Sequence, residues 1–300
     1  MSRLTTILAG VELKNPVIAA SGTFGFGKEF EGYFDPGILG GISGKGLTLN
    51  GSKGNKGIRV CETPAGMMNS IGLENPGVEH FVKEGCKIMR STGAAVICNL
   101  GGHSLEDYVK AAELLNEADI DILELNISCP NVKEGGMAFG MCGATASDVV
   151  KRVKAVTRFP LMVKLSPNAN DIIEVARAVE DAGADAISLI NTLLGMKIDV
   201  VRRKPIFNNI YAGVSGPAVM PIALRMVHQV CKAVKIPVVG MGGISSYTDA
   251  LEFIMAGAVA VQVGTANFAN PYTMPRIIEG LEKYCIQNSL ENISEIRGII

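Results

Sequence analysis

DILELNISCP, residues Asp121–Pro130, is one of eight short apolar runs that together decide the fold. Similar runs recur along the whole chain. They are PVIAAS (Pro16–Ser21), GISGKGLT (Gly41–Thr48), AAVICNLG (Ala94–Gly101), LMVKLSP (Leu161–Pro167), AISLIN (Ala186–Asn191), PVVGMGG (Pro237–Gly243) and VAVQVGT (Val259–Thr265). Near-continuous apolar residues of this kind mark strands that are buried on both faces, as in a parallel sheet.

Amphipathic patterns that predict helices lie between these runs. Leu105–Ala118 follows Ser104, a suitable N-cap, and Asp171–Ala182 carries apolar residues three and four positions apart. The other predicted helices are Ala146–Val156, Val219–Val234 and Tyr247–Ala256. The glycines of AGAD (Ala182–Asp185) and AGAV (Ala256–Val259) each follow a helix and fit a left-handed C-cap.

Buried strands alternating with helices predict an α/β fold, a single (β/α)8 TIM barrel. A small N-terminal hairpin is expected to close the barrel bottom, with strands Thr5–Ile7 and Val11–Leu13 and a turn at Ala9–Gly10. The alternative, an open doubly wound sheet, would need a nucleotide fingerprint near the first strand. GTFGFGK at Gly22–Lys28 begins like a phosphate loop, but Glu29 stands where that loop needs Ser or Thr.

The composition indicates one folded domain over residues 1–300. Hydrophobic residues make up 48% and charged residues 19%, which is ample for a core, and the net charge of −1 gives no basic footprint for nucleic acid. The N-terminus does not resemble a signal peptide, and no window has the roughly 18 uninterrupted apolar residues of a membrane helix. We therefore expect a cytoplasmic protein. The seven scattered cysteines predict neither a disulfide framework nor a metal site.

Polar residues stand at the carboxyl ends of the predicted strands, where barrel enzymes place their active sites. Lys45 lies between glycines after the second strand, and Lys164 lies within an otherwise apolar strand. A buried, unpaired charge is costly, so Lys164 must face the barrel mouth or be paired. Further polar residues at strand ends are Asn99, Asn126, Ser128, Cys129, Asn131, Asn191 and Thr192.

Glycines follow the last two predicted strands. Gly242, Gly243 and Gly264, with Thr265 and joined by Gly216, would let the backbone approach a phosphate closely; tight turns without a ligand are the alternative. Amide side chains read flat, hydrogen-bonding heterocycles well because each has donors and an acceptor. The barrel mouth thus suits a phosphate-bearing cofactor and a planar polar substrate.

Six segments resemble the class 1 dihydroorotate dehydrogenases, in order and spacing along nearly the whole chain. They are NSIGLENPG (Asn69–Gly77), ELNISCPN (Glu124–Asn131), VKLSP (Val163–Pro167), LINT (Leu189–Thr192), GMGGI (Gly240–Ile244) and VGTANF (Val263–Phe268). The first two segments together are highly specific for this family, whereas GMGGI alone would be weak evidence for it. Departures are slight: Ser70 stands where the family often has Ala, and Glu74 where it often has Gln.

The resemblance implies one FMN per chain in the barrel mouth and no metal. The flavin would be lined by Ala20, Ser21, Lys45, Gly46, Asn99, Asn126, Lys164 and Ile190. Its tail and phosphate would be held by Gly216, Gly242, Gly243, Gly264 and Thr265. Dihydroorotate would be gripped by Lys45, Asn69, Ser70, Ile71, Gly72, Leu73, Asn126, Asn131, Asn191 and Thr192.

The resemblance also implies the chemistry, the oxidation of (S)-dihydroorotate to orotate in de novo pyrimidine (UMP) biosynthesis. Cys129 would be the base that removes the C5 proton, while a hydride passes from C6 to FMN. Lys45 would lie near the substrate carboxylate. Lys164 would stabilise negative charge on the reduced flavin.

Within class 1, three segments resemble class 1B, the NAD+-linked form. They are NISCPNVKEGG (Asn126–Gly136), KLSPN (Lys164–Asn168) and NTLLGMKID (Asn191–Asp199). Class 1B implies a homodimer core within a heterotetramer, whose second subunit carries FAD and a [2Fe-2S] cluster and passes electrons to NAD+. Class 1A, a homodimer that uses fumarate, is the alternative. Met196–Asn209 is expected to border a flexible active-site loop or the dimer surface.

Three other functions compete with this interpretation. A dihydropyrimidine or IMP-type barrel dehydrogenase would also use a cysteine and GMGGI. A Schiff-base aldolase would use Lys164 and need no flavin. A non-catalytic scaffold barrel would give the lysines and asparagines at the strand ends no common purpose.

Overall fold

The computed structural model describes residues 2–128 and 139–300 and contains a closed, parallel eight-stranded barrel. Around the barrel the strand order is β3-β4-β7-β8-β9-β10-β15-β16. The strands are β3 (Val17–Ala19), β4 (Gly41–Ser43), β7 (Ala95–Leu100), β8 (Ile122–Asn126), β9 (Leu161–Lys164), β10 (Ala186–Leu189), β15 (Val238–Met241) and β16 (Ala260–Val263). Each lies within one of the eight predicted runs, so the predicted (β/α)8 TIM barrel is confirmed.

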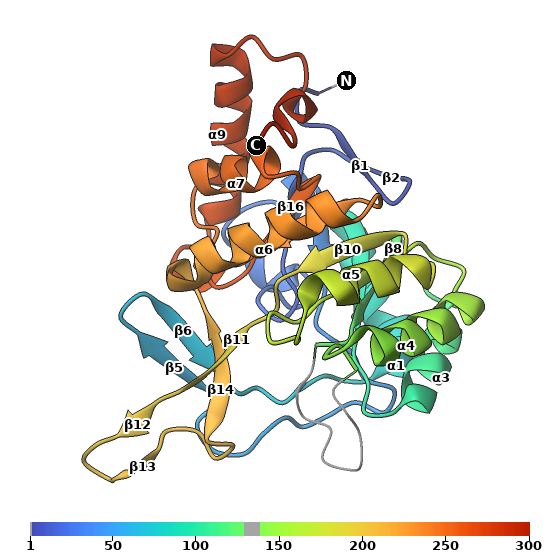
Figure 1. The fold of residues 1–300 in the computed structure, drawn as a ribbon, viewed down its shortest axis with the longest axis vertical. Coiled ribbons are helices and arrows are strands. Elements are labelled where there is room, and N and C mark those ends of the chain that lie inside the picture. Colours follow the sequence, from blue (N-terminus) through green and yellow to red (C-terminus); the bar gives the residue numbers. More distant parts are fainter. Residues whose placement is uncertain (1, 129–138) are drawn as a thin grey trace.

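Helices surround the barrel (Figure 1). Five were predicted, and their ends differ from the prediction by at most a few residues: α3 (Leu105–Leu115), α4 (Gly143–Val156), α5 (Ile172–Asp181), α6 (Met220–Ala233) and α7 (Tyr247–Met255). Ser104 caps α3 by accepting a hydrogen bond from the Asp107 backbone N–H at 3.1 Å. Gly183 and Gly257 have φ of 97° and 118°, as left-handed caps require.

The sequence interpretation did not include several other helical segments. They are α1 (Val78–His80), the π-helical turn η3 (Phe81–Gly85), α2 (Cys86–Ser91), α8 (Ala266–Ala269), α9 (Thr273–Gln287) and the 3-10 turns η1 (Lys28–Phe30), η2 (Pro36–Ile38), η4 (Pro217–Val219) and η5 (Ile293–Ile296). Among the described residues, no helix is both long and apolar enough to cross a membrane.

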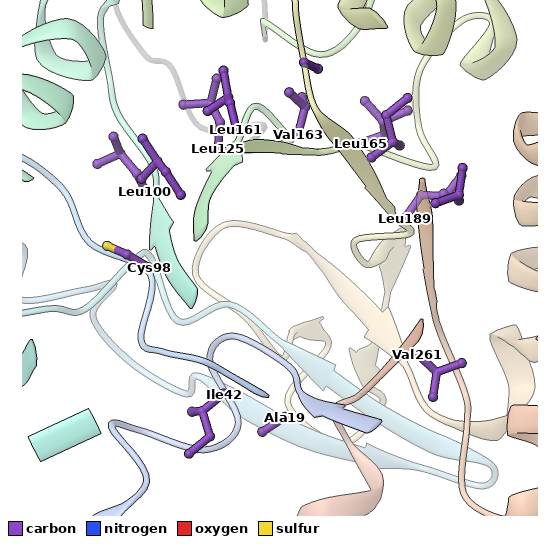
Figure 2. Close-up of a cluster of buried hydrophobic side chains, with 14 of the residues drawn as sticks. Ala19, Ile42, Cys98, Leu100, Leu125, Leu161, Val163, Leu165, Leu189 and Val261 are labelled. Atoms are coloured by element: carbon purple, nitrogen blue, oxygen red, sulfur yellow. The ribbon is translucent and has the colours of Figure 1, made fainter. Parts of the chain in front are cut away.

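Alternate residues of each barrel strand face opposite sides, because side chains in a strand alternate. One set packs between the barrel and its helices. Ten residues of this set are labelled in Figure 2, where they lie around the barrel; Cys98, Leu125 and Val261 are among them. The other set fills the interior, where Ile97, Ile122 and other apolar residues form a second buried cluster. The strands are therefore buried on both faces.

The N-terminal hairpin closes one end of the barrel interior. It consists of β1 (Thr6–Leu8) and β2 (Val11–Leu13), and Leu8 and Leu13 are fully buried in the interior cluster. The predicted hairpin is confirmed, although its first strand starts one residue later than expected. This apolar plug leaves the opposite, carboxyl end of the strands for a polar site.

A four-stranded antiparallel sheet stands at that opposite end (Figure 1). Its order is β11-β14-β6-β5, formed by β5 (Val60–Thr63), β6 (Gly66–Asn69), β11 (Leu193–Met196) and β14 (Tyr211–Ser215). A smaller pair, β12 (Ile198–Asp199) and β13 (Lys204–Pro205), extends beyond it. The sequence interpretation did not predict this sheet, and it left Met196–Asn209 as a loop border or dimer surface.

Candidate active site

A cavity of about 500 Å³ opens at the carboxyl end of the barrel. Its walls come from the barrel strand ends and from the four-stranded sheet, which supplies Met67, Asn69 and Leu193 among others. Every predicted site residue that the structure describes lines this one cavity. They are Ala20, Ser21, Lys45, Gly46, Asn69, Ser70, Ile71, Gly72, Leu73, Asn99, Asn126, Lys164, Ile190, Asn191, Thr192, Gly216, Gly242, Gly243, Gly264 and Thr265.

Two predicted residues, Cys129 and Asn131, lie outside the described residues. Their expected roles as base and substrate contact therefore stay predictions. The roles of the residues that line the cavity also stay predictions, although the fold brings these residues together from distant parts of the chain.

The predicted phosphate side of the cavity is built on glycine backbone. Gly216, Gly242 and Gly243 have φ of 103°, 129° and 80°, which favour glycine. An ideally placed Cβ on Gly243 would lie 2.7 Å from Met220 Cβ and 2.9 Å from the Gly216 carbonyl oxygen. Beside them the Thr265 hydroxyl donates to Ser215 Oγ at 2.8 Å. A side chain on Gly243 would therefore collide with neighbouring protein atoms, so this part of the cavity wall can pack closely only with glycine.

Gly243→Ala is expected to lower the free energy of unfolding by about 1–3 kcal/mol and to weaken binding of the predicted FMN, because the added methyl group meets backbone in a left-handed conformation. Gly10→Ala is the matched control: Gly10 has φ of 83° with nothing within 4 Å of its would-be Cβ. Urea unfolding and FMN titration would measure both effects. Equal FMN affinities for the two variants would contradict the expectation.

Asparagine and serine side chains form a hydrogen-bonded chain at the ends of β8 and β10. Ser128 Oγ donates to Asn126 Oδ1 at 2.5 Å and accepts a short hydrogen bond from Asn191 Nδ2. Asn191 Oδ1 accepts from the Thr192 backbone N–H at 2.8 Å. This chain holds two predicted substrate-contacting amides in fixed orientations, which suits recognition of a flat polar ring.

The two predicted lysines differ in environment. Lys164 is 5% exposed, and its register neighbours are Asn126 on β8 and Ser188 on β10. Lys45 is half-buried at the cavity wall. Burial lowers the pKa of Lys45 below its ordinary value, with Glu74 opposing and Arg59 assisting the shift. Both ammonium groups are placed to attract an anionic or electron-rich ligand.

Behind the cavity wall, Glu124 on β8 is fully buried and accepts four hydrogen bonds. Ser43 Oγ and Asn99 Nδ2 donate to its Oε2 at 2.6 and 2.7 Å. Ser188 Oγ and Gln262 Nε2 donate to its Oε1 at 2.7 and 2.8 Å. An ionised carboxylate has about four acceptor positions, so this carboxylate is saturated.

Burial alone would raise the pKa of Glu124. The Lys164 charge and hydrogen bonds from Ser43, Asn99 and Ser188 outweigh it, so the pKa lies below its usual value. A lowered folded-state pKa adds stability that is complete above the unfolded-state pKa, about 4.3 for Glu, and is lost as pH falls through the folded-state pKa.

We expect Glu124→Gln to flatten the loss of stability of the protein at low pH. The wild-type free energy of unfolding should fall more steeply than that of the variant as the pH drops below about 4.3, because only the wild type takes up a proton at this side chain when it unfolds. Urea unfolding between neutral pH and pH 3 measures this. Glu252→Gln, at an exposed position on α7, is the control and should keep the wild-type slope. Parallel curves for wild type and Glu124→Gln would argue against the assignment.

Some cavity residues were missed from the sequence. They include Asn55, Val60, Met67, Asn168, Leu194, Asn209 and Tyr211, which lie on the antiparallel sheet or on loops. Asn168, Leu194 and Asn209 stand in segments quoted above but were not predicted as site residues, and no local pattern marks the other four. Gln262 is different, because it is a polar residue inside the apolar run VAVQVGT, the same signal that singled out Lys164. Glu124 shares that signal. Ser215, beside the predicted Gly216, could have been found by adjacency.

Comparison with known proteins agrees with this arrangement. The model of the family described as dihydroorotate dehydrogenase matches residues 3–285. The chain is 55% identical over 293 residues to "Dihydroorotate dehydrogenase B (NAD(+)), catalytic subunit" of Petrotoga mobilis, covering 98% of each chain. A protein with the same name from Brachyspira hyodysenteriae is 53% identical over 300 residues, covering 99% of each chain. The one from Thermoanaerobacter pseudethanolicus is 52% identical over 291 residues, covering 97% of this chain and 96% of that relative.

The closed barrel and its polar cavity at the strand ends define a barrel protein with the architecture of an enzyme active site. The family model and the relatives that match nearly the full length of the chain identify the family within this class of barrel proteins. The chain belongs to the dihydroorotate dehydrogenase family, and the predicted family resemblance is confirmed.

Proposed function

We propose that this chain oxidises (S)-dihydroorotate to orotate in de novo pyrimidine biosynthesis, with FMN bound in the cavity of the barrel mouth. The observation that carries the proposal is the convergence of the described family-motif residues on one cavity that combines glycine backbone, two lysines and several amide side chains. The relatives named as catalytic subunits of dihydroorotate dehydrogenase B support it.

The cavity fits FMN in two respects. Gly216, Gly242 and Gly243 line the cavity and carry no side chain, which suits a phosphate that approaches backbone N–H groups. The carbonyl oxygens of Asn99 and Gln262 are buried without a hydrogen-bond partner among the described residues, which suits a ligand with N–H donors. When bound, FMN supplies a two-electron acceptor for the hydride that leaves C6 of the substrate.

Residues of this chain would do the remaining work. Lys45 would hold the substrate carboxylate, while Asn69, Asn126 and Asn191, with Asn131 and Thr192, would orient the pyrimidine ring. Cys129, as its thiolate, would take the proton from C5, so that the C5–C6 double bond of orotate forms as the hydride leaves C6. Lys164 would stabilise the negative charge that builds up on the flavin side of the cavity.

For the electron acceptor we propose NAD+, reached through a second subunit that carries FAD and a [2Fe-2S] cluster. Support comes from the relatives, whose name specifies both NAD(+) and a catalytic subunit. A homodimer of this chain would form the core of a heterotetramer. Efficient NAD+ reduction by this chain purified alone would contradict the proposal, and rapid fumarate reduction would favour the class 1A alternative.

The test is an absorbance spectrum of the FMN-reconstituted protein before and after anaerobic addition of dihydroorotate. Bleaching of the flavin bands is the expected result, because hydride transfer reduces the flavin. If the flavin bands persist with dihydroorotate but bleach with a dihydropyrimidine, the dihydropyrimidine would replace dihydroorotate as the proposed substrate. Failure to bind FMN would overturn the proposal, and borohydride trapping on Lys164 would then test for aldolase chemistry.

A further inference from the structure

Five buried polar residues from five different strands meet inside the barrel around Glu124. Ser43, Asn99, Ser188 and Gln262 surround it, and none of the five is more than 1% exposed. Their strand neighbours Ile42, Cys98, Leu125, Leu189 and Val261 are among the outer residues labelled in Figure 2. Since neighbours along a strand face opposite sides, the five polar side chains face the interior.

The carboxylate fixes which end of each amide points toward it. A carboxylate accepts hydrogen bonds and cannot donate them, so Asn99 and Gln262 must turn their NH₂ groups toward Glu124. Their carbonyl oxygens are then directed elsewhere, and among the described residues neither has a hydrogen-bond partner. Unpaired buried acceptors are costly, so their orientation calls for a partner that the chain itself does not supply.

Both residues belong to the cavity wall, whereas Glu124, Ser43 and Ser188 do not. The Asn99 carbonyl lies against Gly46, another wall residue, since an ideal Cβ on Gly46 would lie 2.8 Å from Asn99 Oδ1. Two residues of the cavity wall therefore have buried carbonyl oxygens without a partner among the described residues, and both are held by a carboxylate that does not line the cavity.

We propose that Glu124 is a positioning residue: it holds the carbonyl oxygens of Asn99 and Gln262 toward the cavity, where they select a ligand that presents a ring N–H. The inference rests on the proposed function, because oxidised FMN carries a single ring N–H, at N3. Without a partner that only accepts hydrogen bonds, either end of each amide could face the cavity, because an amide carries both a carbonyl oxygen and an NH₂ group. The charge of Glu124 removes that freedom.

The decisive variant is Glu124→Gln, tested by FMN binding to the apoprotein. Glutamine offers one acceptor and one NH₂ group, so one of the two wall amides must reverse to pair with that NH₂ group. The variant should bind FMN on the order of 10- to 100-fold more weakly, because a donor then faces the ligand N–H. Fluorescence titration measures this independently of any turnover.

A second ligand separates positioning from a general loss of structure. In the keto form of 3-deaza-FMN a CH₂ group replaces the N3–H, so the ring keeps nearly the same shape but has no N–H donor there. Wild-type apoprotein should prefer FMN over this analogue on the order of tenfold or more, and Glu124→Gln should lose most of that preference. If Glu124 had a merely structural role, Glu124→Gln would bind both ligands more weakly by the same factor. The preference for FMN would then be unchanged, which would overturn the proposal.

Two further variants complete the design. Ser188→Ala removes one donor to Glu124 without changing a wall amide, so it should keep the FMN preference. Gln262→Met removes one wall acceptor and leaves the carboxylate, so it should lose much of the preference and decides the matter if Glu124→Gln does not fold. Identical preferences in Ser188→Ala and Gln262→Met would contradict the inference.

Failure of this inference and failure of the proposed function give different results. Wild-type apoprotein that binds no FMN overturns both. If the wild-type protein binds FMN and is reduced by dihydroorotate, but Glu124→Gln keeps the wild-type preference for FMN, the proposed function stands. Only the proposed role of Glu124 is then overturned.

Discussion

Replacing Cys129 by alanine is expected to give a folded, flavin-containing protein that dihydroorotate reduces about 10²- to 10⁴-fold more slowly than wild type. That range is the usual contribution of a positioned general base. The C5 proton is not removed by solvent at a comparable rate, so hydride departure from C6 slows with it. Anaerobic stopped-flow measurement of flavin bleaching gives the rate directly, without a second electron acceptor.

Matched cysteine variants make this result specific. Cys142→Ala changes a different thiol, which is half-buried at the N-cap of α4 and is not part of the cavity wall. It should bleach at the wild-type rate. Cys129→Ser should recover part of the activity only at high pH, because a hydroxyl is a much weaker acid than a thiol. A wild-type rate in Cys129→Ala at neutral pH would remove Cys129 from the mechanism.

Lys164→Gln is expected to slow flavin reduction on the order of 10²- to 10³-fold in protein saturated with FMN. Removing one preorganised group that stabilises developing charge in a buried site typically has this effect. Lys164 is 5% exposed and lines the cavity, so solvent does not replace its charge. Stopped-flow bleaching and the reduction potential of the bound flavin should change together, because both depend on that charge.

A lysine on the outside of the barrel provides the control. Lys154 on α4 pairs with Asp185 at a part-buried position away from the cavity, so Lys154→Gln should leave both flavin measurements unchanged. Loss of the Lys164 charge should also raise the pKa of Glu124, since that charge helps to lower it. A Lys164→Gln protein that is reduced at the wild-type rate would move Lys164 to a structural role.

The sequence predicted the barrel because each strand carries its own signal. A strand buried on both faces needs an almost continuous apolar run, and DILELNISCP or PVVGMGG shows this without reference to any distant residue. The antiparallel sheet was missed for the opposite reason. Leu193–Met196 alternates between half-buried and exposed residues and pairs with Tyr211–Ser215 through contacts that only the fold creates.

The site residues also fall into those that a local signal predicts and those that only the fold brings to the site. Lys164 stood out because a charge within an apolar strand has few explanations, and the family motifs supplied most other positions. Asn168 lies within the quoted segment KLSPN but was not predicted as a site residue. In the structure its Nδ2 donates to the Thr192 carbonyl at 3.0 Å and its Oδ1 accepts from the Leu194 N–H, which ties the antiparallel sheet to the barrel.

The sequence by itself determined the barrel strands, most of the surrounding α-helices and the chemistry available at the strand ends, because these depend on local hydrophobic patterns and residue types. Only the tertiary structure decided how the Glu124 side chain is used. Its four donors come from Ser43, Asn99, Ser188 and Gln262, which are far apart in the chain and meet only when the barrel closes. Hydrogen-bond direction depends on such distant partners, so no local pattern can predict which end of an amide faces the cavity.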